Sequence, residues 1–235
     1  MKALPITAAF LPLLVPFAAL AEEKKRSPVD HFQWISFHSP SMPGYRTAEM
    51  LSSGFVGATM TLSSNNERLN LNDLTFRASR DWLEVSHNQD QGRVILRMVR
   101  KPVANERANT LILHNNKTGQ TQTLPFYVNT WLTGAGEMDV NASTARARCK
   151  SLGATLLTTQ EFRTLSRQWF GLSSGHLRKM YPGATVFNNG AQAGDSFWVH
   201  EGKALYLHTG VKSAHRGVNT VCKHDYSTSS TGEMG

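Results

Sequence analysis

The 235-residue sequence lacks the motifs that identify most enzyme and metal sites. It contains no His-Glu-x-x-His and no Cys-x-x-Cys, which are common spacings of zinc ligands. It also lacks a dinucleotide fingerprint and a glycine-rich phosphate loop after a predicted strand. The segment Gly171–Gly175 has the letters of a nucleophile elbow, but a helix is predicted before it, where that elbow requires a strand. We therefore expect no catalytic residues and no cofactor, and a hydrolase is kept only as an alternative.

The nine histidines form no compact group in the sequence. The densest set is His200, His208, His215 and His224, which only folding could bring together. We interpret these residues as surface or capping residues and predict no metal site.

Acidic residues are fewer than basic ones, 17 against 25, which gives a formal net charge of +8. The basic residues are scattered and form no stripe with interleaved aromatic residues, so nucleic-acid binding is not expected. The cationic surface favours attraction to anionic surfaces, an effect that salt would weaken. Hydrophobic residues make up 40% of the chain, with five Trp and eleven Phe, which indicates packed cores.

The N-terminus has the order of a secretory signal peptide. Met1-Lys2 precedes a mostly apolar run to Leu20, small residues end at Ala21, and a charged segment follows. Three prolines interrupt the run, which disfavours a membrane anchor, and no later segment is apolar enough to span a bilayer. We predict a signal peptide over residues 1–21, a linker over 22–29, and a mature chain that passes through the periplasm to the outside.

Only two cysteines are present, Cys149 and Cys222. Disulfides persist in the periplasm and outside the cell, so export predicts a structural bond between these two residues. Closing a loop of about 70 residues would stabilise the fold by roughly 4 kcal/mol in the chain-entropy model. A catalytic cysteine would need a partner base that the sequence does not reveal.

Residues 30–128 have the pattern of an all-β domain, with short apolar or alternating runs between turn residues. About seven strands in about 100 residues predict an immunoglobulin-like β-sandwich with a structural role. Trp34 and Trp82 are expected in its core. The expected strands include Trp34–Phe37, Phe55–Leu62, Trp82–Val85, Arg93–Met98, Thr110–Leu113 and Gln122–Val128.

Residues 129–224 are predicted to form a second, α+β domain, so that the whole chain is β-rich. Glycines and the end of strand patterning predict a short stiff linker over residues 129–136. Asn141 or Ser143 can cap a first helix that ends at Gly153, and Thr158–Glu161 has the spacing of a capping box for a second. Phe162, Leu165 and Trp169 form an apolar stripe that we assign to the core.

Two polar loops and three strands complete the second domain. The loops are expected over 172–195 and 209–216, and the strands over Ser196–His200, Ala204–Leu207 and Gly217–Cys222. The remaining residues, 225–235, are rich in Ser, Thr and Gly and are predicted to be a disordered tail.

The second domain has the outline of a C-type-lectin-like domain, and its residue pattern resembles the C-terminal adhesion module of the intimin and invasin family. The resemblance rests on Val128-Asn129-x-Trp131, Ala145-x-x-x-Cys149-x-x-x-Gly153-x-x-Leu156, Phe197-Trp198 and Val221-Cys222. Trp82-Leu83-x-Val85 and Asn105-Glu106-Arg107 are similar to bacterial immunoglobulin-like spacer domains. The resemblance implies an adhesin-like protein whose lectin-like domain engages a protein receptor.

The chain departs from the family pattern in two ways. Family members carry this module on a long outer-membrane chain with a β-barrel, so we expect a separate intimin-like barrel partner to move or tether this protein. The Glu-Pro-Asn, Gln-Pro-Asp and Trp-Asn-Asp motifs of calcium-dependent lectins do not occur, which favours protein recognition over sugar binding.

We predict that the two loops contact the protein partner on a host or bacterial surface. The candidate contact residues are Asn188, Asn189 and Asp195 in the first loop and Lys212, His215 and Arg216 in the second. The alternative for each is an ordinary solvated loop residue. A periplasmic assembly or inhibitor protein remains the competing function.

Overall fold

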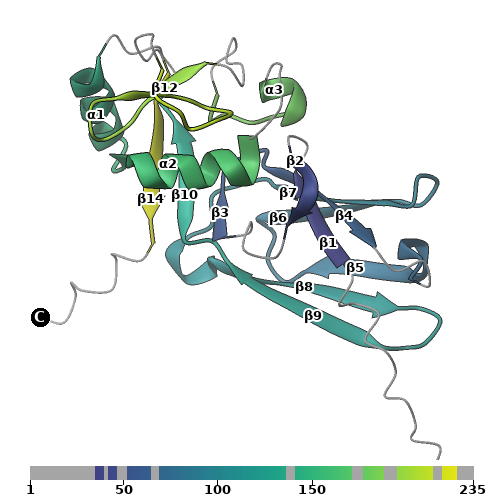
Figure 1. Ribbon diagram of the computed structural model, residues 1–235. Helices are drawn as coiled ribbons and strands as arrows, with labels where there is room; N and C mark the ends of the chain where they lie inside the picture. Colours follow the sequence, from purple (N-terminus) through teal and green to yellow (C-terminus); the bar gives the residue numbers. More distant parts are fainter. Residues whose placement is uncertain are drawn as a thin grey trace, which may run out of the picture.

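The computed structural model describes residues 35–39, 42–46, 52–64, 69–135, 141–170, 177–187, 195–213 and 219–226. The predicted signal peptide, the linker 22–29 and Trp34 lie outside the described residues. The described chain is β-rich, with several sheets and few helices, as the sequence predicts (Figure 1). Among these residues no helix is long and apolar enough to cross a membrane.

The first half of the chain, here the first unit, forms two antiparallel sheets. The larger has the strand order β2-β1-β4-β7-β6 and the smaller the order β5-β8-β9. Alternating burial along β7 and β8 turns one face of each strand toward the core, as expected for half-buried strands. The strands are β1 (Ile35–Ser39), β2 (Met42–Arg46), β4 (Thr59–Ser64), β5 (Leu74–Ala78), β6 (Leu83–Asn88), β7 (Arg93–Met98), β8 (Ala108–Asn115) and β9 (Thr121–Tyr127).

Two sequence predictions for this unit are tested directly. Trp82 is fully buried and its indole Nε1 donates a hydrogen bond to the Glu106 carbonyl at 2.8 Å, so its core assignment is confirmed. The single strand expected over Phe55–Leu62 is wrong. A turn with Gly57 at φ +88° separates β3 (Ser53–Gly54) from β4, because that left-handed conformation cannot continue a strand.

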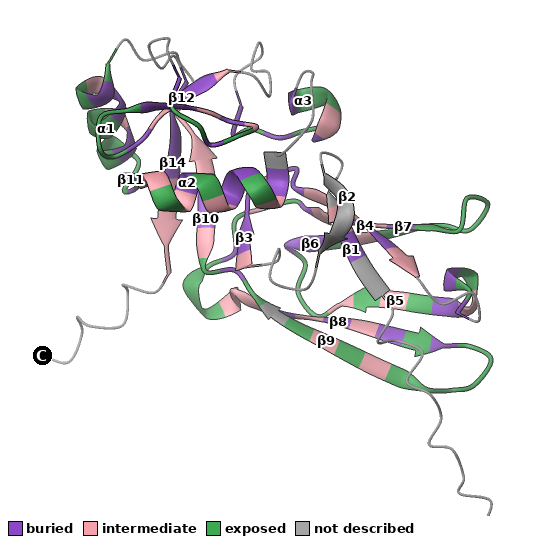
Figure 2. Cartoon of the chain, in the orientation of Figure 1, coloured by how far each residue is buried: buried purple, intermediate pink, exposed green. Residues whose placement is uncertain are grey.

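The second half, here the second unit, is built on a four-stranded sheet of order β11-β14-β10-β3. The linker expected over 129–136 is wrong for residues 130–134, which form β10 and pair along their length with β14. Short helices lie beside this sheet, and Figure 2 shows buried and exposed residues interspersed along α2. The elements are β10 (Thr130–Gly134), α1 (Ala142–Ser151), β11 (Thr155–Leu156), α2 (Thr159–Leu165), a π-helical segment (Ser166–Phe170), α3 (Leu177–Met180), β12 (Ser196–Trp198), β13 (Ala204–Tyr206) and β14 (Val221–Asp225).

The helix signals of the second unit are confirmed. The Asn141 side chain caps α1, and Gly153 follows that helix at φ +63°. Thr158 and Glu161 form both bonds of the capping box at the start of α2. Phe162, Leu165 and Trp169 are buried, as the apolar stripe predicts.

The two units share one continuous core. β3 comes from the first half of the sequence but pairs in parallel with β10 of the second. Next to it, the Phe55 ring packs edge-on against Trp169, Tyr181 and Phe187 at centroid distances of 5.4, 5.2 and 5.7 Å. The Trp169 Nε1 donates to the Ser53 hydroxyl at 2.9 Å inside the same contact. The units are therefore joined by packed side chains and strand pairing.

The long loop expected over 172–195 is corrected by this contact. Within it, Leu177, Tyr181, Ala184 and Val186 are buried, so the segment 177–187 packs against the core. The chain also stays ordered beyond the expected end of the domain at residue 224. Asp225 pairs with Thr130 in the sheet, and the Tyr226 amide donates to the Asn129 carbonyl at 3.1 Å.

Candidate functional site

The β12–β13 hairpin anchors the segments that enter and leave the two predicted loops. Phe197 in β12 bridges Asn219, and Leu205 in β13 bridges Lys212. The Asn219 amide donates to the Ser196 carbonyl at 3.3 Å, and the Ser213 amide donates to the Ala204 carbonyl at 2.8 Å. These bonds bring chain positions 195, 212–213 and 219 to one hairpin. We call the described residues 195–198, 206–213 and 219 the apical edge; it lies at the top of Figure 1.

Two of the six predicted contact residues lie on the apical edge. The Asp195 carbonyl accepts a hydrogen bond from the Leu207 amide at 3.0 Å, so this residue is tied to the hairpin. Lys212 is exposed at its bridge to Leu205. Asn188, Asn189, His215 and Arg216 lie outside the described residues.

The apical edge also holds apolar surface that the sequence did not single out. Val211 is 58% exposed directly before Lys212. The Tyr206 ring is half-buried and lies 6.1 Å from the His208 ring. Exposed valine and partly exposed tyrosine beside a cation suit a protein contact, because apolar area supplies affinity and charge supplies orientation.

Arg163 of α2 fixes the turn at Gly210, which directly precedes Val211 and Lys212. Gly210 adopts φ +65°, and its Cα lies so close to Arg163 that an added Cβ would come within 2.8 Å of that side chain. The Arg163 Nε donates to the Gly210 carbonyl at 3.0 Å. The glycine in the sequence was the one available signal for this close approach.

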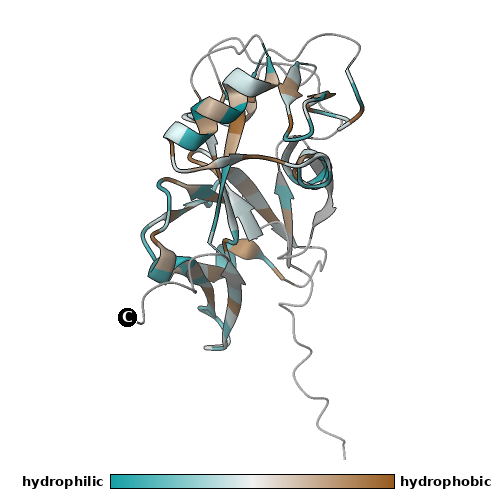
Figure 3. Cartoon of the chain, turned by 90° about the vertical axis from the view of Figure 1, so that its left-hand side faces the viewer, coloured by the Kyte–Doolittle hydropathy of each residue, from teal (hydrophilic) through white to brown (hydrophobic). Residues whose placement is uncertain are grey.

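The disulfide joins the helix and the sheet beneath the apical edge. It links Cys149 of α1 to Cys222 of β14, and both residues are fully buried. Ala145 and Leu156 pack beside it in a small cluster of its own. α1 itself faces the viewer in Figure 3, where hydrophilic and hydrophobic residues alternate on its surface.

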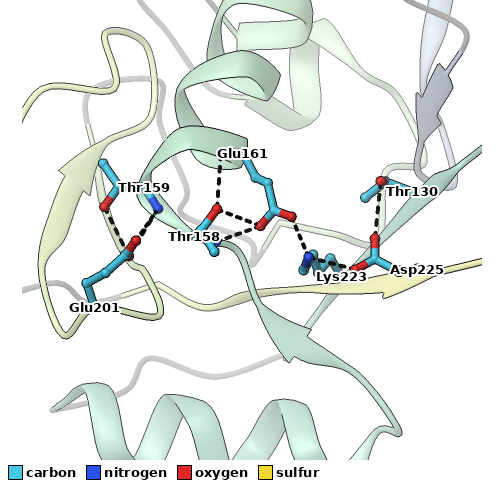
Figure 4. Close-up of polar contacts among 7 residues, drawn as sticks. All are labelled: Thr130, Thr158, Thr159, Glu161, Glu201, Lys223 and Asp225. Carbon is cyan, nitrogen blue, oxygen red and sulfur yellow. Dashed lines mark hydrogen bonds and ion pairs between the residues drawn. The ribbon is translucent and has the colours of Figure 1, made fainter. Parts of the chain in front are cut away.

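A charged network joins the start of α2 to β14 (Figure 4). The Lys223 Nζ is 2.5 Å from Glu161 Oε1 and 2.6 Å from Asp225 Oδ2. Burial opposes the charge on Lys223, but hydrogen bonds to Asp225 and Glu161 raise its pKa above the ordinary value. Burial also acts against ionised Glu161, yet the bonds from Lys223 and Thr158 lower the pKa of that carboxyl. Each charge has a partner, which is typical of a structural network.

Other titratable groups offer little for chemistry in the part of the chain that the structure describes. No group of three or more His, Cys, Asp or Glu residues is placed to hold a metal ion there. Of the four clustered histidines, His200 is exposed and His208 and His224 are half-buried, while His215 lies outside the described residues.

Comparisons with known proteins agree on fold alone. No protein-family model and no curated protein matches this sequence. The crystal structure of invasin, described as a bacterial integrin-binding protein, is similar with a TM-score of 0.55 and 17% sequence identity. The similarity covers 81% of this chain and 38% of the invasin chain. The protein therefore has an invasin-like fold.

Proposed function

We propose that this protein is a secreted, adhesin-like binding protein whose second unit recognises a protein partner through the apical edge. The observation that carries the proposal is the anchoring of both predicted loops on one hairpin, beside exposed Val211 and Lys212. The invasin-like fold supports it, since invasin is described as integrin-binding. Loops on a rigid scaffold are a common arrangement for recognition.

In this proposal the partner meets Val211 and Lys212 together with the adjoining loop residues. Asn188, Asn189 and Asp195 contribute hydrogen bonds from one loop, and His215 and Arg216 contribute charge from the other. The buried disulfide and the bond from Arg163 to Gly210 keep the surface fixed before binding. A preformed surface loses less conformational entropy on association.

The first unit serves as the immunoglobulin-like spacer that carries the lectin-like second unit. Its β-strands and the shared core support this role, since a stiff body positions a terminal recognition surface. The signal-peptide pattern supports export, and in this proposal a separate outer-membrane protein moves the chain out of the cell or tethers it there. Fractionation of the native host tests localisation: accumulation in the periplasm alone would favour an assembly or inhibitor protein.

A cell-binding assay tests the function. The fluorescently labelled mature chain, residues 22–235, is expected to bind host cells saturably, and protease treatment of the cells should remove the binding. Replacing Lys212, His215 and Arg216 together with Ala should weaken it about tenfold or more and reduce its salt dependence. Lys150→Ala on α1 is the control, because that side chain is exposed and does not belong to the apical edge.

Two results of this assay would contradict the proposal. Equal binding by the triple variant and the parent chain would contradict the site. Binding that survives protease treatment of the cells would contradict a protein partner. Val211→Ser refines the result: a loss of affinity that does not change with salt would assign the apolar part of the interface to this residue.

A further inference from the structure

A cleft between the two units lies at the end of β14 away from the apical edge. Its volume is about 410 Å³, and it is lined by residues 101–104 of the first unit and by Gly153 and residues 224–226 of the second. β14 spans five residues between the two places. At the usual rise per residue this separates the cleft from the apical edge by roughly 15 Å.

A bond across the unit boundary joins the walls of the cleft. The Tyr226 hydroxyl donates to the Pro102 carbonyl at 2.5 Å. Burial raises the pKa of Tyr226 to about 12, so this hydroxyl stays protonated and remains a donor. Asp225, the carboxylate in the lining, is already paired with Lys223 at 2.6 Å. The two sides of the cleft are therefore held together, and the carboxylate in its lining is already ion-paired.

Two basic side chains line this cleft. Lys101 comes from the loop after β7, and His224 comes from β14. Within the described chain no carboxylate lies in ion-pair distance of the Lys101 amine. Burial lowers the pKa of both groups, and the charge of Lys101 lowers that of His224 further. An anion placed between them would favour the charged form of each group and so raise both pKa values.

Apolar surface borders the same cleft. Val103 is 55% exposed and forms part of the lining, and Pro102 is buried beside it. Leu152, which is 43% exposed, directly precedes the lining residue Gly153. Exposed aliphatic side chains next to the Lys101 cation suit a ligand that has a carboxylate and an aliphatic group side by side.

We propose that this cleft binds an acidic peptide segment of a partner protein, with a carboxylate between Lys101 and His224 and a neighbouring aliphatic side chain against Val103. The charge of the cleft selects the acid, and the exposed valine selects the aliphatic neighbour. The site is separate from the apical edge, so it does not depend on the function proposed above.

Binding at this site is linked to the protonation of His224. The groups around its ring are the Lys101 amine, the Asp225 carboxylate and the Gly153 backbone. A bound carboxylate favours the imidazolium, so the peptide raises the pKa of His224. Affinity therefore increases as the pH falls through the pKa of His224, until the peptide carboxyl itself becomes protonated near pH ~4.

The test uses the mature chain and the dipeptide acetyl-Glu-Leu-amide, followed by the NMR signals of the His224 ring. We expect a saturable shift, with millimolar affinity, and a higher pKa of His224 in the complex. Acetyl-Gln-Leu-amide, which has the same shape without the charge, should bind at least about twofold more weakly. Lys101→Gln should weaken binding of the Glu peptide about two- to fivefold, and Lys150→Gln should leave it unchanged.

The proposal is overturned by any of three results: no saturable shift of His224, equal binding of the Glu and Gln peptides, or equal binding by Lys101→Gln. Lys101 is exposed, so its replacement is not expected to impair folding. The triple variant at Lys212, His215 and Arg216 should bind the dipeptide like the parent chain. If this variant binds the dipeptide normally but does not bind cells, the loss of cell binding is assigned to the apical edge and not to the cleft.

Discussion

Lys223 is the cation shared by the two acids of the charged network. Only 11% of its side chain is exposed, and it stands between two carboxylates, Glu161 and Asp225. The Glu161 carboxylate also accepts bonds from the Thr158 amide and hydroxyl, each at 2.8 Å. The ion pairs thus connect the start of α2 to β14, and removing the cation would remove the Lys223 contact from both acids.

Lys223→Met should lower the free energy of unfolding by about 1–2 kcal/mol, because both acids are partly exposed and water screens them. Urea denaturation followed by circular dichroism measures the change. Lys203→Met is the matched control, since the Lys203 side chain is exposed. Equal stability of the two variants would mean that Lys223 contributes nothing as an ion pair.

The lowered pKa of Glu161 leads to a prediction of how the free energy of unfolding depends on pH. Its pKa in the folded protein lies below the ordinary value of 4.5, so its contribution is complete above that pH and is lost as the pH falls through the folded pKa. The free energy of unfolding should therefore fall more steeply below pH ~4.5 in the parent chain than in Glu161→Gln. Asp81 and Glu201 also have lowered pKa values, so the variant keeps part of the slope. Parallel pH profiles would refute this role.

At the scale of elements, predictions were correct where the signal was local. The capping box of α2 and the alternation of β7 each lie within a few residues, and the structure has both elements where they were expected. β10 was missed because its central residues, Trp131 and Leu132, are both buried, which removes the alternation of a half-covered strand. Gly134 looked like a linker residue, but it allows the close approach of the Val186 carbonyl.

The candidate site was predictable to a similar degree. Its loops follow from polar composition, and Asp195 and Lys212 lie at the hairpin. The packing of residues 177–187 against the core was not predictable, because their partner Phe55 lies more than a hundred positions earlier in the chain. Such a contact leaves no periodic pattern in either segment.

The disulfide between α1 and β14 gives a prediction about these two elements. Replacing Cys149 and Cys222 together with Ser should lower the free energy of unfolding by about 3–4 kcal/mol, because the loop between them spans a sequence separation of 73. A reducing agent should destabilise the parent chain by a similar amount and leave the double variant unchanged. If reduction shifts both proteins equally, the effect does not come from this bond.

For the whole molecule, the shared core implies that the two units unfold together. Phe55 and β3 belong to the first half of the chain yet complete the core and the sheet of the second. Arg97 adds a bond across the boundary, from its guanidinium to the Pro182 carbonyl at 2.6 Å. Neither unit would keep its buried surface covered if the other opened, so a single cooperative transition is expected.

Gly57 offers the sharpest test of that coupling. It lies at φ +88°, and an added Cβ would come within 2.5 Å of the Ala184 backbone nitrogen across the unit boundary. Gly92 also has a positive φ, +56°, but nothing lies within 4 Å of its added Cβ. Gly92→Ala should therefore cost about 1 kcal/mol for its backbone conformation alone. Gly57→Ala should cost at least about 2 kcal/mol, because the boundary must also move apart.

The measurement for Gly57→Ala is which of the two units loses stability. Trp82 reports on the first unit and Trp169 on the second, and both are fully buried. If the units are one cooperative body, a chain whose only tryptophan is Trp82 and a chain whose only tryptophan is Trp169, each with Phe at the other four positions, should show the same fall in midpoint on Gly57→Ala. A midpoint that falls at Trp169 and stays unchanged at Trp82 would show that the boundary transmits no stability. The apical edge would then be supported by the second unit alone, because the contacts made by Phe55 would fill space without coupling the two halves.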